Sequence, residues 1–312
     1  MTRDLYLMRF SFTHPMSAGC YDPLLVSGIG LSSMARIAET AGFDGISFTD
    51  HPIPSSRWLA AGGHEALDPF SALAFCAAAT EKLRLITNVV VLPYRNPFVV
   101  AKAAVTVDLL SEGRLTLGLG AGYLRAEFRA LGVDPAERNE LFDEALDVLL
   151  TVWASDDVAI AGRHFSAPGN TARPQPVQRP HPPLWIGGNS ARARERVVRW
   201  GQGWNPFPVS SAVAPSTGTA PLQTSDDLRG MLDDLWERLD AAGRSDPVDV
   251  HFVCPVGGSP GDADFNADAH LEGLKDLAAI GVTWVSIDIP GDDLGRATEA
   301  ISRYGEEVIR KF

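Results

Sequence analysis

The chain has 312 residues, of which 45% are hydrophobic and 21% are charged. This composition is ordinary for a soluble globular protein, and the length allows two domains or one large α/β barrel of roughly 250 residues with insertions. The 27 basic and 39 acidic residues give a net charge of −12, which argues against general nucleic-acid binding because phosphates need a basic face. Three widely spaced cysteines argue against a disulfide framework and a cysteine-based zinc site.

The sequence shows no feature of a membrane or secreted protein. The first residues, MTRDLYLMRFSF, carry charges and no apolar segment, so we expect no signal peptide. No apolar run approaches the roughly 20 residues that span a bilayer. We therefore expect a cytoplasmic protein whose partner is a small-molecule substrate, with no membrane and no nucleic acid bound.

Short apolar runs alternate along the chain with amphipathic stretches. The apolar runs predict strands at 5–10, 43–48, 83–92, 115–119, 184–186, 203–205, 248–253 and 282–289. Helices are predicted between and after them at about 31–41, 69–79, 97–110, 135–153, 191–200, 225–242, 266–280 and 294–309. Asp68-Pro69 and Asn96-Pro97 are typical helix starts, in which a capping residue precedes a first-turn proline.

Two stretches interrupt this alternation. Residues 155–183 are rich in proline, arginine and glutamine, residues 206–224 are irregular, and we interpret both as insertion loops. Eight strands that are each followed by a helix close into a (β/α)8 barrel when right-handed crossovers join them. The sequence therefore predicts one TIM-barrel domain over residues 1–312, with its site at the C-terminal ends of the strands.

The segment that ends the second strand contains a candidate acid–base group. In Thr49-Asp50-His51-Pro52, the histidine can exchange a proton near neutral pH and the neighbouring acid can fix its tautomer. Because neighbouring residues on a strand point to opposite faces, Asp50 and His51 need not share one site. A loop histidine beside a helix-capping aspartate is the structural alternative.

Glycines follow the fourth and fifth strands. The segment 118–123, GLGAGY, does not fit the dinucleotide fingerprint, because Tyr123 occupies the position of its last glycine. These glycines either let a flat ligand approach the backbone or pack tightly at the barrel rim. Gly187-Gly188-Asn189-Ser190 precedes a helix, whose N-terminal N–H groups and dipole favour an anion. Of the arginines that follow, we expect Arg192 to contact this anion and the others to be solvated, namely Arg194, Arg196 and Arg199.

Several other residues leave two interpretations open. Arg95 is either a solvated charge or an anion contact, and His14 either faces the barrel mouth or does not. His64-Glu65 lacks the second histidine of a zinc-protease motif, so no metal site is predicted. Four tryptophans either line a flat-ligand pocket or belong to the core, namely Trp58, Trp185, Trp204 and Trp284.

Four stretches together resemble the bacterial luciferase-like superfamily of flavin and deazaflavin oxidoreductases. They are residues 39–51, 83–146, 174–190 and 201–207, and they follow the family's order. The segments GLGAGYLRAEF and PPLWIGGNS are similar to actinobacterial members that use coenzyme F420, a deazaflavin with an anionic tail. The resemblance implies a TIM-like barrel with an insertion and a homodimer.

The resemblance also implies roles for individual residues around the ring. His51 matches the active-site histidine, and Asp50 lies beside it in sequence. Asn88-Val89 match the position of a non-proline cis peptide that bulges under the ring, so we expect the ring to contact Val89 and Val90.

Three further matches concern the cofactor's chain, its phosphate and the proton donor. Ala121-Gly122 match the backbone beside the ring and the ribityl chain, and Gly187-Gly188-Asn189 match the phosphate turn. Tyr123 stands where the sugar-phosphate dehydrogenase branch has a catalytic glutamate. This departure argues against glucose-6-phosphate oxidation and makes Tyr123 an alternative proton donor.

These observations predict an F420-dependent oxidoreductase that transfers a hydride between the deazaflavin C5 and a small organic substrate. One alternative is an FMN-dependent monooxygenase that uses O2 and a flavin reductase partner. The other is a non-catalytic protein that binds a flavin or deazaflavin. The substrate is expected to be selected by residues 55–67, 155–183 and 206–224.

Overall fold

Eight parallel strands close into a barrel within residues 8–16 and 20–312, the part of the chain that the computed structural model describes. In chain order they are β1 (Arg9–Thr13), β2 (Gly45–Phe48), β3 (Arg84–Thr87), β5 (Leu115–Gly120), β8 (Leu184–Gly187), β9 (Gly203–Asn205), β10 (Asp249–Val253) and β11 (Trp284–Ile287). The pairing of β1 with β11 and of β3 with β5 closes the cylinder. The predicted (β/α)8 TIM barrel is therefore confirmed.

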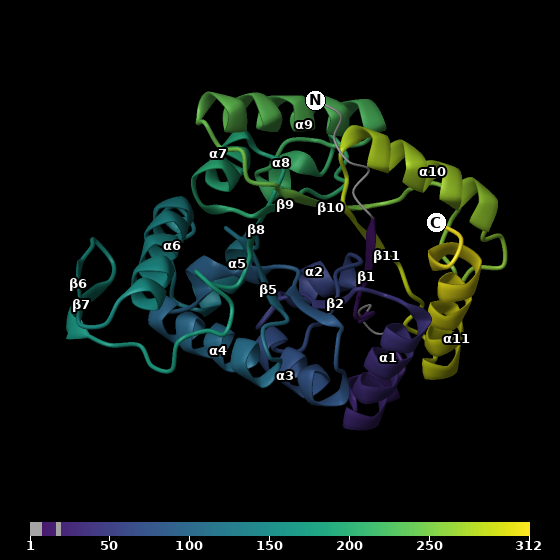
Figure 1. Cartoon of the computed structure of the whole chain (residues 1–312), viewed down its shortest axis with the longest axis horizontal. Helices are drawn as coiled ribbons and strands as arrows, with labels where there is room; N and C mark the ends of the chain where they lie inside the picture. The colour runs from purple at the N-terminus through teal and green to yellow at the C-terminus, as the bar shows by residue number, and fades with distance from the viewer. Residues whose placement is uncertain (1–7, 17–19) are drawn as a thin grey trace.

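Helices surround the barrel in Figure 1. The longer ones are α1 (Gly28–Ala41), α3 (Pro69–Ala79), α4 (Pro97–Leu110), α6 (Arg138–Ala154), α7 (Ala191–Trp200), α9 (Ser225–Ala241), α10 (Ala267–Ile280) and α11 (Leu294–Tyr304), which continues as a π-helical segment over Gly305–Ile309. The predicted caps are present: the Asp68 side chain accepts from the Ser71 N–H, and the Asn96 side chain accepts from the Phe98 N–H. None of the helices in the described residues combines the length and apolar character that a membrane span needs.

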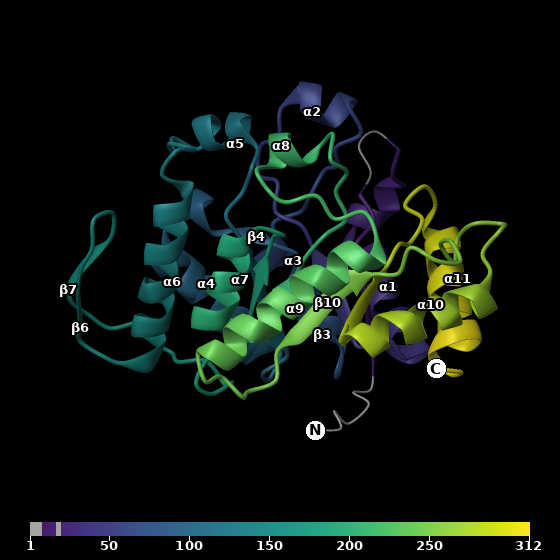
Figure 2. The same ribbon diagram turned by 90° about the horizontal axis from the view of Figure 1, so that it is seen from above.

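Three short helices lie together on one side of the barrel in Figure 2. They are α2 (Ser56–Ala60), α5 (Arg125–Ala130) and α8 (Ala214–Thr217), and they follow β2, β5 and β9 in the chain. Two 3-10 turns lie in the connections before α1 and α4, at Pro23–Val26 and Leu92–Tyr94. This side of the barrel, which we call the mouth, is the side at the C-terminal ends of the strands.

The structure differs from the sequence predictions at several places. The first strand covers Arg9–Thr13, and residues 5–7 of the predicted strand lie outside the described residues. The predicted strand 83–92 is broken at the cis peptide Asn88–Val89 and resumes as β4 (Val90–Val91). The stretch 155–183 was expected to be a loop, but it contains an antiparallel hairpin of β6 (Val158–Ala161) and β7 (Ser166–Asn170).

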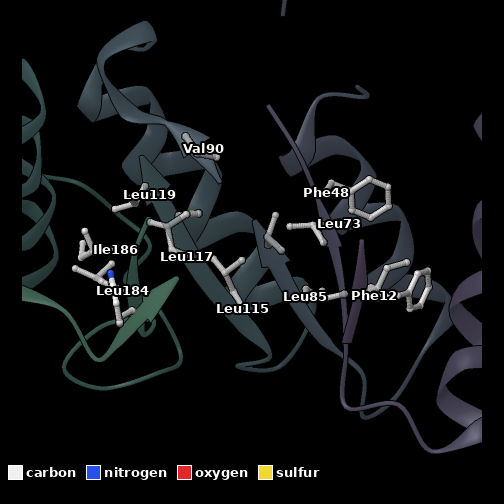
Figure 3. Close-up of a cluster of buried hydrophobic side chains, with 14 of the residues drawn as sticks. Phe12, Phe48, Leu73, Leu85, Val90, Leu115, Leu117, Leu119, Leu184 and Ile186 are labelled. Atoms are coloured by element: carbon white, nitrogen blue, oxygen red, sulfur yellow. The ribbon is translucent and has the colours of Figure 1, made fainter. Parts of the chain in front are cut away.

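Alternation along the strands separates two apolar regions. Leu115, Leu117 and Leu119 of β5 lie beside Leu184 and Ile186 of β8 in Figure 3, within the large cluster between the barrel and its helices. A separate cluster of Ile86, Trp185 and Trp284 is packed away from it. Trp185, Trp204 and Trp284 are fully buried, so these three tryptophans belong to the core rather than to a ligand pocket.

Candidate active site

A cavity of about 550 Å³ opens at the mouth, above the ends of β2, β3, β5 and β8. We call it cavity A. Its lining includes ten of the residues predicted from the sequence: Asp50, His51, Asn88, Val89, Ala121, Gly122, Tyr123, Gly187, Gly188 and Arg192. Two other predicted residues, Val90 and Asn189, are fully buried and are not among its lining residues. The topology thus brings most of the sequence-predicted site into one cavity.

Val90 and Asn189 support the cavity from behind. Val90 pairs with Leu119 in the sheet, and its side chain belongs to the main core. The Asn189 amide group donates to the carbonyl oxygens of Phe207 and Ala220 and accepts from the Phe207 N–H. Asn189 therefore ties the 206–224 segment to the turn before α7, and its side chain has no capacity left for a phosphate.

His51 is paired with a buried carboxylate that we had not predicted. Its Nδ1 lies 3.1 Å from Oε2 of Glu127, which is fully buried. The same carboxylate accepts from the Tyr94 hydroxyl at 3.1 Å and from the Ile53 N–H at 3.2 Å. With Nδ1–H donated to Glu127, Nε2 of a neutral His51 is left as the acceptor.

Asp50 has a different set of partners from those expected. It accepts from the Val91 N–H at 3.0 Å and from the Arg95 guanidinium at 2.8 Å. Arg95 also pairs with Asp68, at the start of α3. The acid that fixes the His51 tautomer is therefore Glu127, while Asp50 and Arg95 hold the segment after β4 in place. Arg95 is neither a solvated charge nor a lining residue of cavity A.

Aromatic groups surround His51. Its ring centroid lies 4.7 Å from that of Trp58, 4.8 Å from that of His64 and 6.4 Å from that of Tyr123. Burial, and then the nearby Glu127 carboxylate, raise the pKa of Tyr123, so at neutral pH its hydroxyl can donate a proton but does not serve as a base. Burial lowers the pKa of His64 and favours its neutral form. His51 therefore lies in a half-buried aromatic wall.

The other end of cavity A is basic. Arg138, Arg192 and Arg196 line it next to the Gly187–Ser190 turn, where α7 begins. The sequence predicts a solvated Arg196, but its side chain is buried, and its Nε lies 2.6 Å from Asp143. Arg192 pairs with the other oxygen of Asp143 at 2.7 Å. Asp143 pairs with two of the three guanidinium groups, so the lining keeps an excess of positive charge, which suits an anionic ligand.

Arg194 and Arg199 lie outside this lining. Arg194 is also not solvated, because its side chain is mostly buried and is paired with Asp234. Arg199 is exposed and pairs with Asp147, as expected of a solvated helix face.

Val89 lines cavity A, and neighbouring glycines make room for its side chain. A Cβ on Gly120 would lie 2.6 Å from Cγ2 of Val89, and one on Gly187 would lie 3.2 Å from Cγ1. A Cβ on Gly118 would meet the Thr87 carbonyl oxygen at 2.0 Å. The space freed by these glycines is thus filled by protein atoms, which supports the interpretation of tight packing at the rim.

We expect Gly120→Ala to destabilise the protein and to weaken ligand binding in cavity A. The new methyl group would displace Val89, and such overpacking costs about 1–3 kcal/mol. Chemical denaturation measures the loss. Gly230→Ala is the matched control, because nothing lies within 4 Å of its Cβ position in α9 and alanine gains up to about 1 kcal/mol over glycine in a helix. Equal stabilities of the two variants would contradict the packing role of Gly120.

A chain of side-chain hydrogen bonds crosses the barrel at the mouth. His251 Nε2 lies 2.9 Å from the Ser11 hydroxyl, and Nδ1 lies 2.9 Å from Oδ1 of Asn205. The Asn205 amide then donates to Oδ1 of Asn88 at 2.7 Å, and the Asn88 amide donates to the Thr13 hydroxyl at 3.0 Å. These contacts fix the tautomer with the proton on Nδ1 of His251 and hold Asn88 beside Val89.

We expect His251 to make the protein less stable in acid. Burial lowers the pKa of His251 from 6.5 to about 4, so the unfolded chain takes up the proton first as the pH falls. The stability present above pH 6.5 is therefore lost toward pH 4, by about 1.4 kcal/mol per pH unit. Denaturation measured from pH 7 to pH 4 should show a shallower slope for His251→Gln than for the unchanged chain. An unchanged slope would contradict this assignment.

His14 resembles His251 in burial but lies outside the cavities. Its Nε2 lies 3.1 Å from the Leu25 carbonyl oxygen, and its ring stacks on Phe48. Burial lowers its pKa to about 4. His14 is absent from the described linings of the mouth cavities, so it does not face the site.

Sequence reasoning missed Glu127 and Arg196 for different reasons. Glu127 lies on α5, a helix of 6 residues with no side-chain cap and no apolar period to predict it. Arg196 follows Arg192 by one helical turn, which placed both on one face of α7. That spacing was the available signal, since residues four apart on a helix are neighbours.

Comparison with known proteins assigns the chain to one family. Residues 30–272 match the family model of the luciferase-like monooxygenases. An FMNH2-dependent dimethylsulfone monooxygenase from Pseudomonas putida is 32% identical over 173 residues, 53% of this chain and 45% of that protein. An F420-dependent glucose-6-phosphate dehydrogenase from Beutenbergia cavernae is 37% identical over 176 residues, 54% of this chain and 49% of that protein. These matches cover about half the length of the two relatives.

One solved structure has the same fold over the whole chain. The crystal structure of the monooxygenase RslO1 from Streptomyces bottropensis aligns with a TM-score of 0.78. The alignment covers 97% of this chain and 99% of that one, at 20% identity. At this identity the likeness establishes the architecture alone.

Proposed function

Because the chain belongs to the luciferase-like monooxygenase family, we propose that it is an F420-dependent oxidoreductase acting on a small organic substrate. The observation that carries this proposal is the make-up of cavity A. It combines the apolar side chain of Val89, the arginines of α7 and the His51–Glu127 pair. The 37% identity to a relative named as F420-dependent adds support.

The residues of cavity A fit a flat ring with an anionic tail. Val89 offers the ring an apolar contact, with Ala121 and Gly122 at its edge. The start of α7, with Arg192 and Arg196, offers the tail cationic groups and helix-terminal N–H groups. When bound, the deazaflavin supplies a two-electron carrier that accepts or gives a hydride. The protein supplies orientation and electrostatics.

His51 handles the proton that accompanies the hydride. In the direction of substrate oxidation, Nε2 accepts the proton that the substrate loses, and in the direction of reduction it returns that proton. Glu127 stabilises the imidazolium that forms, because its carboxylate accepts the Nδ1–H. Tyr123, whose pKa is raised by burial, is the second group at the cavity that can donate a proton.

The second candidate is an FMN-dependent monooxygenase that uses O2 and a flavin reductase partner. It is favoured by the 32% identity to a relative named as FMNH2-dependent. Titration of the purified protein, freed of cofactor, with F420 and separately with FMN tests the choice through fluorescence quenching. We expect saturable binding of F420 with at least about tenfold preference over FMN, a difference of 1.4 kcal/mol. Tight FMN binding without F420 binding would overturn the first proposal.

Consumption of oxygen with reduced FMN would then identify the monooxygenase. We also propose a homodimer, on the strength of the family resemblance. Native mass spectrometry of protein from an F420-producing host would give the subunit number and the mass of any bound cofactor together.

A further inference from the structure

A second cavity of about 560 Å³ opens at the mouth, above the ends of β1, β9, β10 and β11. We call it cavity B. It shares three lining residues with cavity A, namely Asn88, Asn205 and Phe207. Each cavity has the size of an ordinary small-molecule site, which is roughly 300–1,000 Å³. The mouth therefore offers two adjoining sites, one on each side of a common wall.

Hydrogen bonds between side chains hold the common wall in place. Asn205 donates to Asn88 across it at 2.7 Å, and Asn205 is in turn fixed by His251, which is almost fully buried. The Asn88 amide is anchored on Thr13 of β1. Because every one of these groups is held by another, the wall keeps the two cavities distinct while leaving them in contact.

The two cavities differ in charge. The lining of cavity A includes Arg138, Arg192 and Arg196, whereas the described lining of cavity B contains no arginine or lysine. Cavity B instead carries the exposed carboxylates of Asp262 and Asp288. Desolvation, and then the neighbouring Asp262 carboxylate, raise the pKa of Asp288.

The remaining lining of cavity B combines uncharged polar side chains and histidines with an apolar part. It includes the side chains of Phe207, Phe252 and Ile287, together with Pro206 and Pro208. An apolar ligand body can therefore be buried beside the wall while a cationic group reaches the aspartates. Phosphates and carboxylates would meet the same aspartates with repulsion of about 1 kcal/mol or more, since like charges are disfavoured.

We propose that cavity B binds the organic substrate and selects a molecule with an apolar body and a cationic amine over anionic molecules. The identification of the ligand as a substrate rests on the proposed function, whereas the selectivity rests on the cavity itself. The cavity and its wall make the site, and the aspartates set its preference. Cofactor and substrate then meet at Asn88 and Asn205.

Three probes of similar shape test the selectivity: phenylbutylamine, phenylbutanol and phenylbutyrate. Isothermal titration should give the amine at least about tenfold tighter binding than the alcohol, with the carboxylate weakest. In the double variant Asp262→Asn, Asp288→Asn the amine and the alcohol should bind within about twofold of each other. Equal affinities in the unchanged protein, or tightest binding of the carboxylate, would overturn the proposal.

Asp292→Asn is the matched control, because Asp292 is paired with Arg296 outside the described lining of cavity B. It should keep the preference for the amine. If Asp292→Asn weakened this preference as much as the double variant does, Asp262 and Asp288 would act through the net charge of the protein alone. The titrations are repeated with the cofactor saturating. Retained amine binding places the amine in cavity B, whereas competition with the cofactor places it in cavity A and overturns the proposal.

The two proposals can fail separately in this experiment. Amine preference without binding of F420 or FMN would contradict the proposed function and support the selectivity of cavity B. Cofactor binding without amine preference would contradict the assignment of cavity B and leave the proposed function intact.

Discussion

Replacement of Glu127 by alanine is expected to lower the free energy of unfolding by about 3 kcal/mol or more, since each buried donor left without an acceptor costs about 1–3 kcal/mol. The side chain is fully buried and accepts from His51, Tyr94 and the Ile53 N–H. Alanine would leave all three donors without an acceptor, and unsatisfied buried groups are costly. Urea denaturation at pH 7 measures the loss.

A conservative variant and a surface control serve as comparisons for Glu127→Ala. Glu127→Gln keeps the shape and one acceptor oxygen, so it should lose less than the alanine variant. Glu140→Ala removes an exposed carboxylate that pairs with Arg163, and exposed pairs contribute about 0–1 kcal/mol. A Glu127→Ala protein as stable as Glu140→Ala would show that Glu127 does not stabilise the side chains around His51.

Replacement of His51 by alanine is expected to slow hydride transfer by about 10²–10⁴-fold, the contribution of a positioned general acid or base. His51 lines cavity A near its aromatic wall, so the affinity for the cofactor should change little. Single-turnover absorbance of the cofactor, with a substrate found by turnover screening, gives the rate. Fluorescence titration of the same protein gives the dissociation constant.

Two further variants separate the chemical role of His51 from a structural one. His51→Asn keeps a side-chain donor for Glu127 but has no titratable ring, so it should fold normally and remain slow. Tyr123→Phe should cost less than His51→Asn if His51 is the main proton carrier. Full hydride-transfer activity in both His51 variants would exclude this role, and loss of cofactor affinity in proportion to the rate would show a role in binding.

The barrel was predictable because its signals are local and repeated. The capping pairs Asp68-Pro69 and Asn96-Pro97 begin α3 and α4 as expected, and Gly42 and Gly281 end α1 and α10 in the left-handed region, at φ of 96° and 104°. The hairpin β6–β7 was not predictable in this way. Of its nine strand residues, Val158 and Ala167 are buried, so it has almost no apolar pattern to detect.

The positions of the site residues followed from the topology, but their partners did not. The ends of parallel strands meet at one side of a barrel, which is why His51, Val89 and Gly187 could be assigned to one cavity from the sequence. Which acid pairs with His51 depends on how α5 folds back over β2, and no local rule specifies that contact. Asp50 is adjacent to His51 in sequence, whereas Glu127 is adjacent to it in space.

A crystal structure of the protein with F420 bound would locate the ring and the tail of the cofactor. We expect the deazaflavin ring within van der Waals contact of Val89, about 4 Å, and its anionic tail at the start of α7 beside Arg192 and Arg196. A ring bound in cavity B, or a tail that leaves the Gly187–Ser190 turn without a contact, would contradict this expectation.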